Sequence, residues 1–277
     1  MGIYVNTNLM AMNAYQNLET NQMNMQSALS QLSSGYRINK AADDAAGLVI
    51  SEELRSQVSG FQQATANAQQ GVNLVQTAEG ALNETQAILQ RVRTLTVEAA
   101  NGTTDNVGLS AIWAEVSQSL LEIDQISKTA VYGSETLLSG GSTGSVFTFQ
   151  LGALGTVNIA LTISGANSND LGIGSTVVAS YATNASAANV LASVDAAISY
   201  VSSLRGTLGA YQTRLEHAIN NLNVGVQNLS ASESSIRDTD MAATMVQFTK
   251  SQILVQAGVS MLSQANAAPQ SILKLLG

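Results

Sequence analysis

The sequence contains no cysteine and only one proline and one histidine. Without cysteine the chain has no disulfide, no thiolate metal site and no cysteine nucleophile. Since His217 is the only histidine, a His-Glu-x-x-His zinc site is excluded. A Ser-His-Asp triad built on His217 would have to sit in the middle of a predicted helix. We therefore expect no enzyme activity, no metal and no cofactor.

Charged residues make up 11% of the chain and aromatic residues 4%, and the formal net charge is −8. The acidic balance argues against nucleic-acid binding, which needs clustered lysine and arginine. No apolar run approaches the roughly 18 residues of a membrane span, so membrane insertion is not expected. The first residues lack the basic and apolar regions of a secretory signal, which taken alone would favour the cytoplasm.

Apolar residues dominate a long stretch near the C-terminus. From Leu191 to Ile236, alternate steps of three and four residues meet apolar side chains at eleven of fourteen positions. This spacing places them on one stripe of a helix, with the mean period of a coiled coil. The stripe slips by one residue at Arg237–Asp240 and resumes from Met241 to Leu262. The pattern predicts two helices in different registers, joined by a short charged hinge.

Both ends of the chain are almost free of charge. Residues 1–36 contain Glu19 as their single charged side chain, and residues 241–277 contain only Lys250 and Lys274. Because an exposed helix normally carries charges on its outer face, two such helices are expected to be buried on several sides. Burial in an ordinary core is one alternative, and burial by other copies of the chain is the sharper one. The expected assembly core consists of Leu18, Met25, Leu29, Leu32, Met245, Phe248, Val255, Val259 and Leu262.

Charged residues return in the segment 37–55, which is interrupted by Ala-Ala-Gly and predicts a connector. The pair Asp43-Asp44 suggests acid–base or metal chemistry, but a polar turn at a helix start is favoured. No histidine or cysteine lies nearby, and the spacing is not that of a calcium loop. The residues that mark this connector and the later hinge are Arg37, Asp43, Asp44, Arg237, Asp238 and Asp240.

The middle of the chain predicts two further helices, at 56–100 and from near Val107 to Ala130. The first of them carries a stripe with the same three-and-four spacing, at Val75, Ala78, Leu82, Thr85, Leu89, Val92, Thr96 and Ala99. The glycine-rich region that follows contains two runs of alternating apolar residues, which predict a β-hairpin at about 145–165 with its turn near Ala153–Gly155. The predicted fold is therefore mainly α. It is a long antiparallel, coiled-coil-like helical rod with a small β-hairpin region at its tip.

Several long motifs, in the right order, resemble those of bacterial flagellins. The resemblance covers about residues 1–140 and 185–277. Its motifs are Ser34-Gly-Tyr-Arg-Ile-Asn39, Asp43-Asp-Ala-Ala-Gly-Leu48, Leu89-Gln-Arg-Val-Arg-Thr-Leu95, Ser235-Ile-Arg-Asp-Thr-Asp-Met241 and the ending from Pro269. The chain departs from the family's usual residues at Thr94, Thr96 and Trp113.

The resemblance implies a minimal flagellin without outer domains. Residues 1–40 and 237–277 would form the discontinuous domain D0, residues 41–55 a spoke, and residues 56–236 the domain D1 with the hairpin. The implied function is self-assembly into the flagellar filament for swimming motility. It also implies export through the flagellar type III apparatus and an extracellular location, which accounts for the missing signal.

Partners follow from the same resemblance. An export chaperone would bind the C-terminal helix at 241–277, and hook-associated and cap proteins would contact the filament. A vertebrate Toll-like receptor would read Arg91, Leu95 and Glu115, which are otherwise expected to be lateral filament contacts. Two alternatives stay open, namely a hook–filament junction protein and a secreted adhesin with binding loops at 140–182. Glycosylation in that region, at Ser142 or Ser175, also stays open.

Overall fold

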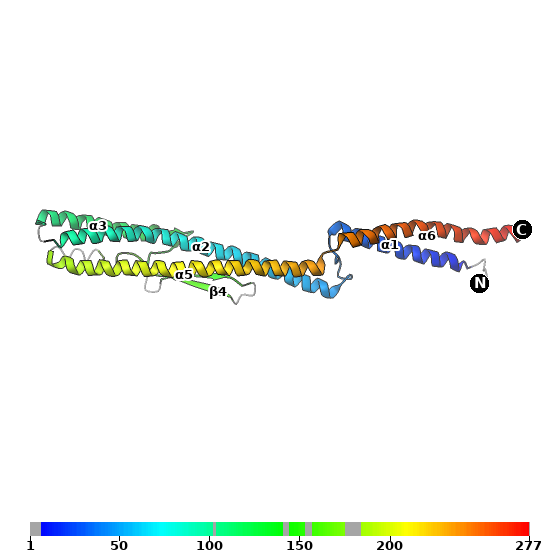
Figure 1. Ribbon diagram of the computed structural model, residues 1–277, viewed down its shortest axis with the longest axis horizontal. Helices are drawn as coiled ribbons and strands as arrows, with labels where there is room; N and C mark the ends of the chain where they lie inside the picture. The colour runs from blue at the N-terminus through cyan, green and yellow to red at the C-terminus, as the bar shows by residue number, and fades with distance from the viewer. Residues whose placement is uncertain (1–6, 102–103, 141–143, 153–156, 175–183, 277) are drawn as a thin grey trace. The chain divides into compact units, whose positions relative to one another are not determined.

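The computed structural model describes residues 7–101, 104–140, 144–152, 157–174 and 184–276 (Figure 1). Helices account for most of the described residues, and a small antiparallel strand region accompanies them, so the predicted fold class is confirmed. The hairpin turn near Ala153–Gly155 and the glycosylation candidates Ser142 and Ser175 lie outside the described residues. The helices are α1 (Leu9–Ser34), α2 (Ala45–Ala99), α3 (Asn106–Thr129), α5 (Asn184–Arg237) and α6 (Met241–Leu276).

The chain divides into two compact units. Residues 1–57 and 228–277 form one, here called the terminal unit, and residues 58–227 form the other, the central unit. The terminal unit contains α1, α6, the first turns of α2 and the end of α5. The central unit contains the rest of α2 and α5, all of α3 and the strands.

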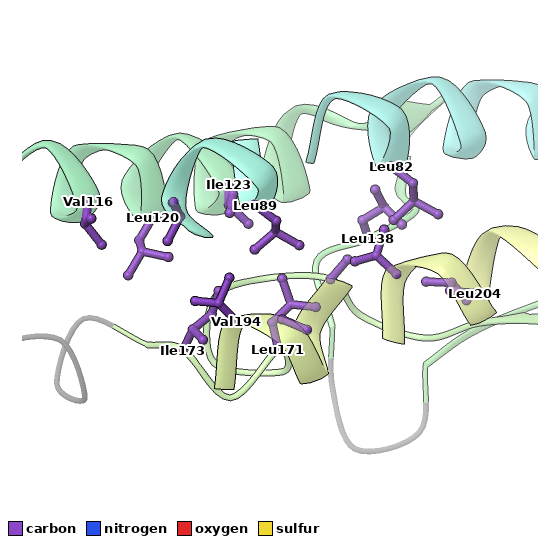
Figure 2. Close-up of a cluster of buried hydrophobic side chains, with 14 of the residues drawn as sticks. Leu82, Leu89, Val116, Leu120, Ile123, Leu138, Leu171, Ile173, Val194 and Leu204 are labelled. Atoms are coloured by element: carbon purple, nitrogen blue, oxygen red, sulfur yellow. The ribbon is translucent and has the colours of Figure 1, made fainter. Parts of the chain in front are cut away.

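The core of the central unit lies between α2, α3 and α5. Figure 2 shows side chains from these helices gathered there, among them Leu89, Leu120 and Val194. The stripe that the sequence predicts on α2 is confirmed, because every one of its positions is buried: Val75, Ala78, Leu82, Thr85, Leu89, Val92, Thr96 and Ala99. The 3/4 spacing therefore identifies the core-facing side of this helix.

Helix α5 is long and apolar enough, by length and composition, to cross a membrane, and the core helix of a soluble protein meets the same criterion. Its apolar stripe packs against protein, since Val194, Val201 and Leu208 are buried in the core of the central unit. The helix ends at Arg237 and α6 begins at Met241. The break therefore falls at the slip in the apolar stripe.

Strands β3 (Ser145–Gln150) and β4 (Asn158–Ile163) pair antiparallel, with Phe149 opposite Ile159. The predicted alternation holds on β4, where Ile159, Leu161 and Ile163 are buried and the residues between them are exposed.

The expected position of this hairpin at the tip of the helices is corrected. Leu151 and Ile159 form a small core with Val72 of α2 and Leu215 of α5. Val72 lies 27 residues before the end of α2 at Ala99, or about 40 Å along the helix. The hairpin therefore lies along the sides of α2 and α5, because its apolar face needs an apolar helix surface to pack on.

A second, shorter antiparallel pair was not predicted. It joins β1 (Val131–Tyr132) to β2 (Glu135–Thr136). The two-residue connection begins at Gly133, whose φ of 67° lies in the left-handed region that glycine adopts without strain. The signal was present, because Gly-Ser between two short runs is a hairpin sequence.

Helix α2 starts at Ala45, earlier than the expected helix at 56. The Asp44 carboxylate accepts the backbone N–H of Gly47 at 2.8 Å, as an N-cap does. The charged segment therefore combines a turn with the first turns of a capped helix. Asp44 thus lies at the start of a helix, as expected from the interpretation of the Asp43-Asp44 pair as a polar turn at a helix start.

Candidate assembly surface

Helices α1 and α6 run side by side in opposite directions (Figure 1). At one end of the pair, the Asn8 side chain caps α1 through the N–H of Ala11 and donates to the carbonyl oxygen of Ala265 at 2.8 Å. Close to the middle, Leu18 packs on Gly258 so tightly that an added Cβ would lie 3.2 Å from Leu18 Cδ1. The two charge-poor ends of the chain therefore pair with each other within a single subunit.

The nine residues of the expected assembly core fall into two groups. One group is half-buried between the helices and contains Leu18, Met25, Leu32, Phe248, Val255 and Leu262. The other group is more than half exposed and contains Leu29, Met245 and Val259. The structure thus brings the first group together within one chain, and leaves the second group facing away from the pair.

Many further apolar side chains on these helices are exposed, and most of them lie outside the predicted stripes. Ile253 and Met261, for example, are each 64% exposed. We call the exposed apolar residues of α1 and α6 the assembly surface: Leu9, Met10, Met12, Tyr15, Met23, Leu29, Met241, Met245, Val246, Ile253, Leu254, Val259 and Met261. The available signal was the lack of charge around them, which leaves no charged face on either helix.

A junction at the other end of the pair ties the end of α1 to the break between α5 and α6. Gly35 ends α1 with a φ of 77°, and its carbonyl oxygen accepts the N–H of Thr239 at 3.0 Å. The next residues continue the link, because the N–H of Arg37 donates to the carbonyl oxygen of Arg237 at 2.7 Å. Tyr36 and Asp238 form an antiparallel bridge between these two bonds.

Arg237 is the most enclosed of the ion-paired side chains of this junction, with 16% of it exposed. Its guanidinium donates to Glu52 Oε1 at 2.9 Å and lies 4.6 Å from the centre of the Tyr36 ring. The Arg37 guanidinium reaches the carbonyl oxygen of Ile236 and lies 4.0 Å from the Asp44 carboxylate. Sequence reasoning marked both arginines as junction residues but did not predict that Glu52 and Tyr36 contact Arg237.

The remaining acidic residues of the junction hold local turns. Asp240 accepts the N–H groups of Ala242 and Ala243 and so caps α6. Asp238 accepts from the Ser234 hydroxyl at 2.6 Å. These carboxylates therefore have structural partners in the positions where the hinge was predicted.

The Asp43 carboxylate accepts two backbone hydrogen bonds, and they lower its pKa. The backbone N–H groups of Lys40 and Asn39 donate to its Oδ2 at 2.9 and 3.0 Å, and they lower the pKa of Asp43 from its usual 3.8. A lowered pKa stabilises the fold fully above pH 3.8, and this contribution is lost as the pH falls through the lowered value. We expect an NMR titration of the folded chain to place the Asp43 midpoint below 3.8. A midpoint at or above 3.8 would contradict these hydrogen bonds.

The three residues of the predicted receptor epitope do not share a surface. Arg91 Nη2 and Glu115 Oε1 form an exposed ion pair at 2.6 Å between α2 and α3. Leu95, by contrast, is 2% exposed and belongs to the core of the central unit. Only Arg91 and Glu115 are therefore placed for direct contact with another protein.

The sequence of this chain matches known proteins along nearly its whole length. Residues 5–143 match the model of the bacterial flagellin N-terminal helical region, and residues 191–276 match that of the C-terminal helical region. A flagellin of Bacillus subtilis is 45% identical, with 98% of this chain and 99% of that protein covered. A flagellar filament 33 kDa core protein of Treponema phagedenis is 40% identical, with the same shares covered.

Solved structures add a likeness of fold. A structure from Vibrio parahaemolyticus, described as that of a flagellar hook-associated protein, aligns with a TM-score of 0.61 at 13% identity. It covers 71% of this chain and 100% of that one. At this identity the match concerns the arrangement of helices and strands alone.

Proposed function

This chain belongs to the bacterial flagellin family and is a structural subunit of the extracellular flagellar filament, and we propose that its copies assemble through the exposed apolar residues of α1 and α6. The observation that carries the proposal is that, among the side chains that the structure describes, the pair leaves thirteen large apolar ones exposed on helices with almost no charge. Exposed apolar side chains that gather on one part of a soluble protein are typical of an interaction surface. Burying it against neighbours supplies the driving force for assembly.

The same surface supports a helical polymer. The apolar residues lie on both α1 and α6, so one subunit offers several contact sides. Contacts of one surface with a different surface of the next copy generate an open helical array when the rotation does not close. Repeated along the chain of subunits, these contacts give a filament with the terminal helices inward.

We propose a division into D0 (1–40 and 237–277), a spoke (41–55) and D1 (56–236). The two compact units support it, since their boundaries fall at residues 57 and 228. In this division the spoke contains the Asp43 turn and the first turns of α2. D0 then provides the assembly surface, and D1 folds around its own core.

The route out of the cell and the partners are also proposals. A chain without cysteine and with one proline suits export as an unfolded polypeptide through the flagellar type III apparatus, because disulfides and slow proline isomers would hinder it. An export chaperone would cover α6 until assembly, which the exposed Ile253 and Leu254 support. Hook-associated and cap proteins would then contact the two ends of the filament.

Removal of the last nine residues tests the role of the C-terminus. We expect a chain that ends at Ala268 to keep the helical circular dichroism of the central unit and to form no stable filament. The reason is that α6, which runs to Leu276, loses its last two turns. Normal filament growth by this truncated chain, seen by electron microscopy, would show that the C-terminus is not needed for assembly.

The hook–filament junction alternative is not favoured, because the curated relatives that cover nearly the whole chain are flagellins and filament core proteins. Electron microscopy of the purified chain separates the two functions. A flagellin grows long filaments by itself, and a junction protein does not.

A vertebrate Toll-like receptor is a further proposed partner of the monomer, through Arg91 and Glu115. We expect Arg91→Asp to lower receptor signalling by at least about tenfold, since an interface arginine is a frequent hot spot. Arg93→Asp is the matched control, because Arg93 also forms an exposed ion pair, with Asp195 at 2.6 Å. Unchanged signalling by Arg91→Asp in a reporter-cell assay would exclude this contact.

A further inference from the structure

Methionine is confined to the two ends of the chain. All eight methionines lie within residues 1–25 and 241–261, and residues 58–227, which form the central unit, contain none. The core of the central unit is built instead mainly from leucine, isoleucine, valine and alanine, together with Trp113. Methionine is therefore a feature of the two ends of the chain, and the central unit packs its core without it.

Most of these methionines are exposed in the single subunit. Six belong to the assembly surface and are 50% to 66% exposed: Met10, Met12, Met23, Met241, Met245 and Met261. A thioether side chain is flexible and polarisable, so it adapts to differently shaped neighbours. It is also, besides cysteine, the side chain that mild oxidants modify, and this chain has no cysteine to compete.

We propose that these six methionines make assembly sensitive to oxidation: a peroxide modifies them in the free subunit, and the modified subunit does not join the filament. The inference rests on the proposed assembly surface. Hydrogen peroxide transfers one oxygen atom to the thioether sulfur, so that an S–O bond forms and the O–O bond breaks. The sulfur is oxidised to the sulfoxide by two electrons, and the peroxide is reduced to water.

The sulfoxide opposes assembly because it turns an apolar contact into a polar one. Its oxygen is a hydrogen-bond acceptor, and burying it without a donor is unfavourable. The paired helices offer few charged donors, because Lys250 and Lys274 are the only cations in the sequences of α1 and α6. Once subunits have assembled, the same methionines are covered by neighbours and shielded from peroxide. The filament is therefore the resistant state and the free subunit the sensitive one.

The experiment compares purified subunits in three states: untreated, treated with hydrogen peroxide, and treated and then repaired by the two methionine sulfoxide reductases, one for each epimer. Seeded growth is followed by sedimentation, and mass spectrometry assigns the sulfoxides. We expect the treated subunits to leave at least about tenfold more protein unassembled, and repair to restore growth. In parallel, peroxide should oxidise the six methionines of assembled filaments at least about tenfold more slowly than those of free subunits.

A variant in which all six methionines are replaced by leucine is the matched control, because leucine keeps the apolar volume and has no sulfur to oxidise. It should grow equally well before and after peroxide. Treated wild-type subunits that carry the sulfoxides and still grow normally would overturn the inference. So would a loss of growth that repair does not reverse, or equal oxidation rates in subunit and filament. Failure of the untreated subunits to grow would instead count against the proposed assembly function.

Discussion

Replacement of Ile253 by aspartate is expected to abolish filament growth while leaving the subunit folded. Ile253 is 64% exposed on α6 and contributes little to the fold of a single chain. A surface substitution of this kind usually changes stability by less than about 0.5 kcal/mol. In the filament the same position would be covered by a neighbour, where an unpaired carboxylate is strongly unfavourable. If the substitution weakens the addition of a subunit to the filament by about 3 kcal/mol, the concentration of free subunit at equilibrium rises roughly a hundredfold.

Ile253→Leu is the matched control for this prediction, because it keeps an apolar side chain of the same size. It is expected to grow filaments like the unchanged chain. Circular dichroism and thermal unfolding of the monomers check that both variants fold equally. If Ile253→Asp assembles as readily as Ile253→Leu, α6 does not use this side in the filament, and the assembly surface is assigned wrongly.

Two adjacent leucines of α3 are expected to differ sharply in their effect on the central unit. Leu120 is 1% exposed and lies in the core with Leu89 and Val194 (Figure 2), whereas Leu121 is 53% exposed. Leu120→Ala is expected to lower the free energy of unfolding by about 2 to 5 kcal/mol, through lost apolar burial and the cavity left behind. Leu121→Ala should cost less than about 0.5 kcal/mol.

The pair is matched because both substitutions remove the same atoms from neighbouring positions of one helix, so helix propensity changes equally. Denaturant unfolding of the monomers measures the difference. For a unit of this size, a loss of 3 kcal/mol also lowers the melting temperature by roughly 6 to 12 °C. If both variants lowered the free energy of unfolding equally, the assignment of Leu120 to the side of α3 that faces α2 and α5 would be wrong.

The sequence predicted those features that depend on neighbours along the helix. The eight stripe positions from Val75 to Ala99 are all buried, because a helix with one apolar stripe has one way to face a core. The break between α5 and α6 was likewise visible as a change of register at Arg237–Asp240. Strand β4 was recognised from strict alternation over six residues.

Features that depend on distant partners were missed. Glu52 pairs with Arg237 across 185 residues of sequence, and the sequence around either residue does not predict this contact. The position of the hairpin beside Val72 and Leu215 has the same origin, since alternation shows which face of a strand is apolar but not which helix receives it. Leu95 was taken from a motif as a contact residue, yet it is buried. It directly precedes the stripe residue Thr96 but is not one of the eight stripe positions, so the stripe did not mark it as buried.

The roles of the residues on the terminal helices α1 and α6 follow only from the local sequence pattern together with the contacts between the two helices. Their lack of charge predicted burial on several sides, but it did not say which apolar residues would be used inside the chain. Leu18, for example, packs against Gly258 of the partner helix, while Ile253 remains exposed. Only the pairing of α1 with α6 separates the residues that hold the subunit together from those proposed to join it to others.

A cryo-electron microscopy reconstruction of the filament grown from this chain tests the central claim most directly. The account predicts that Met10, Ile253 and Met261 contact other subunits, and that Leu120 contacts only residues of its own chain. A filament in which α1 and α6 face solvent with these side chains uncovered, and in which the subunits are joined through the central units alone, would contradict it.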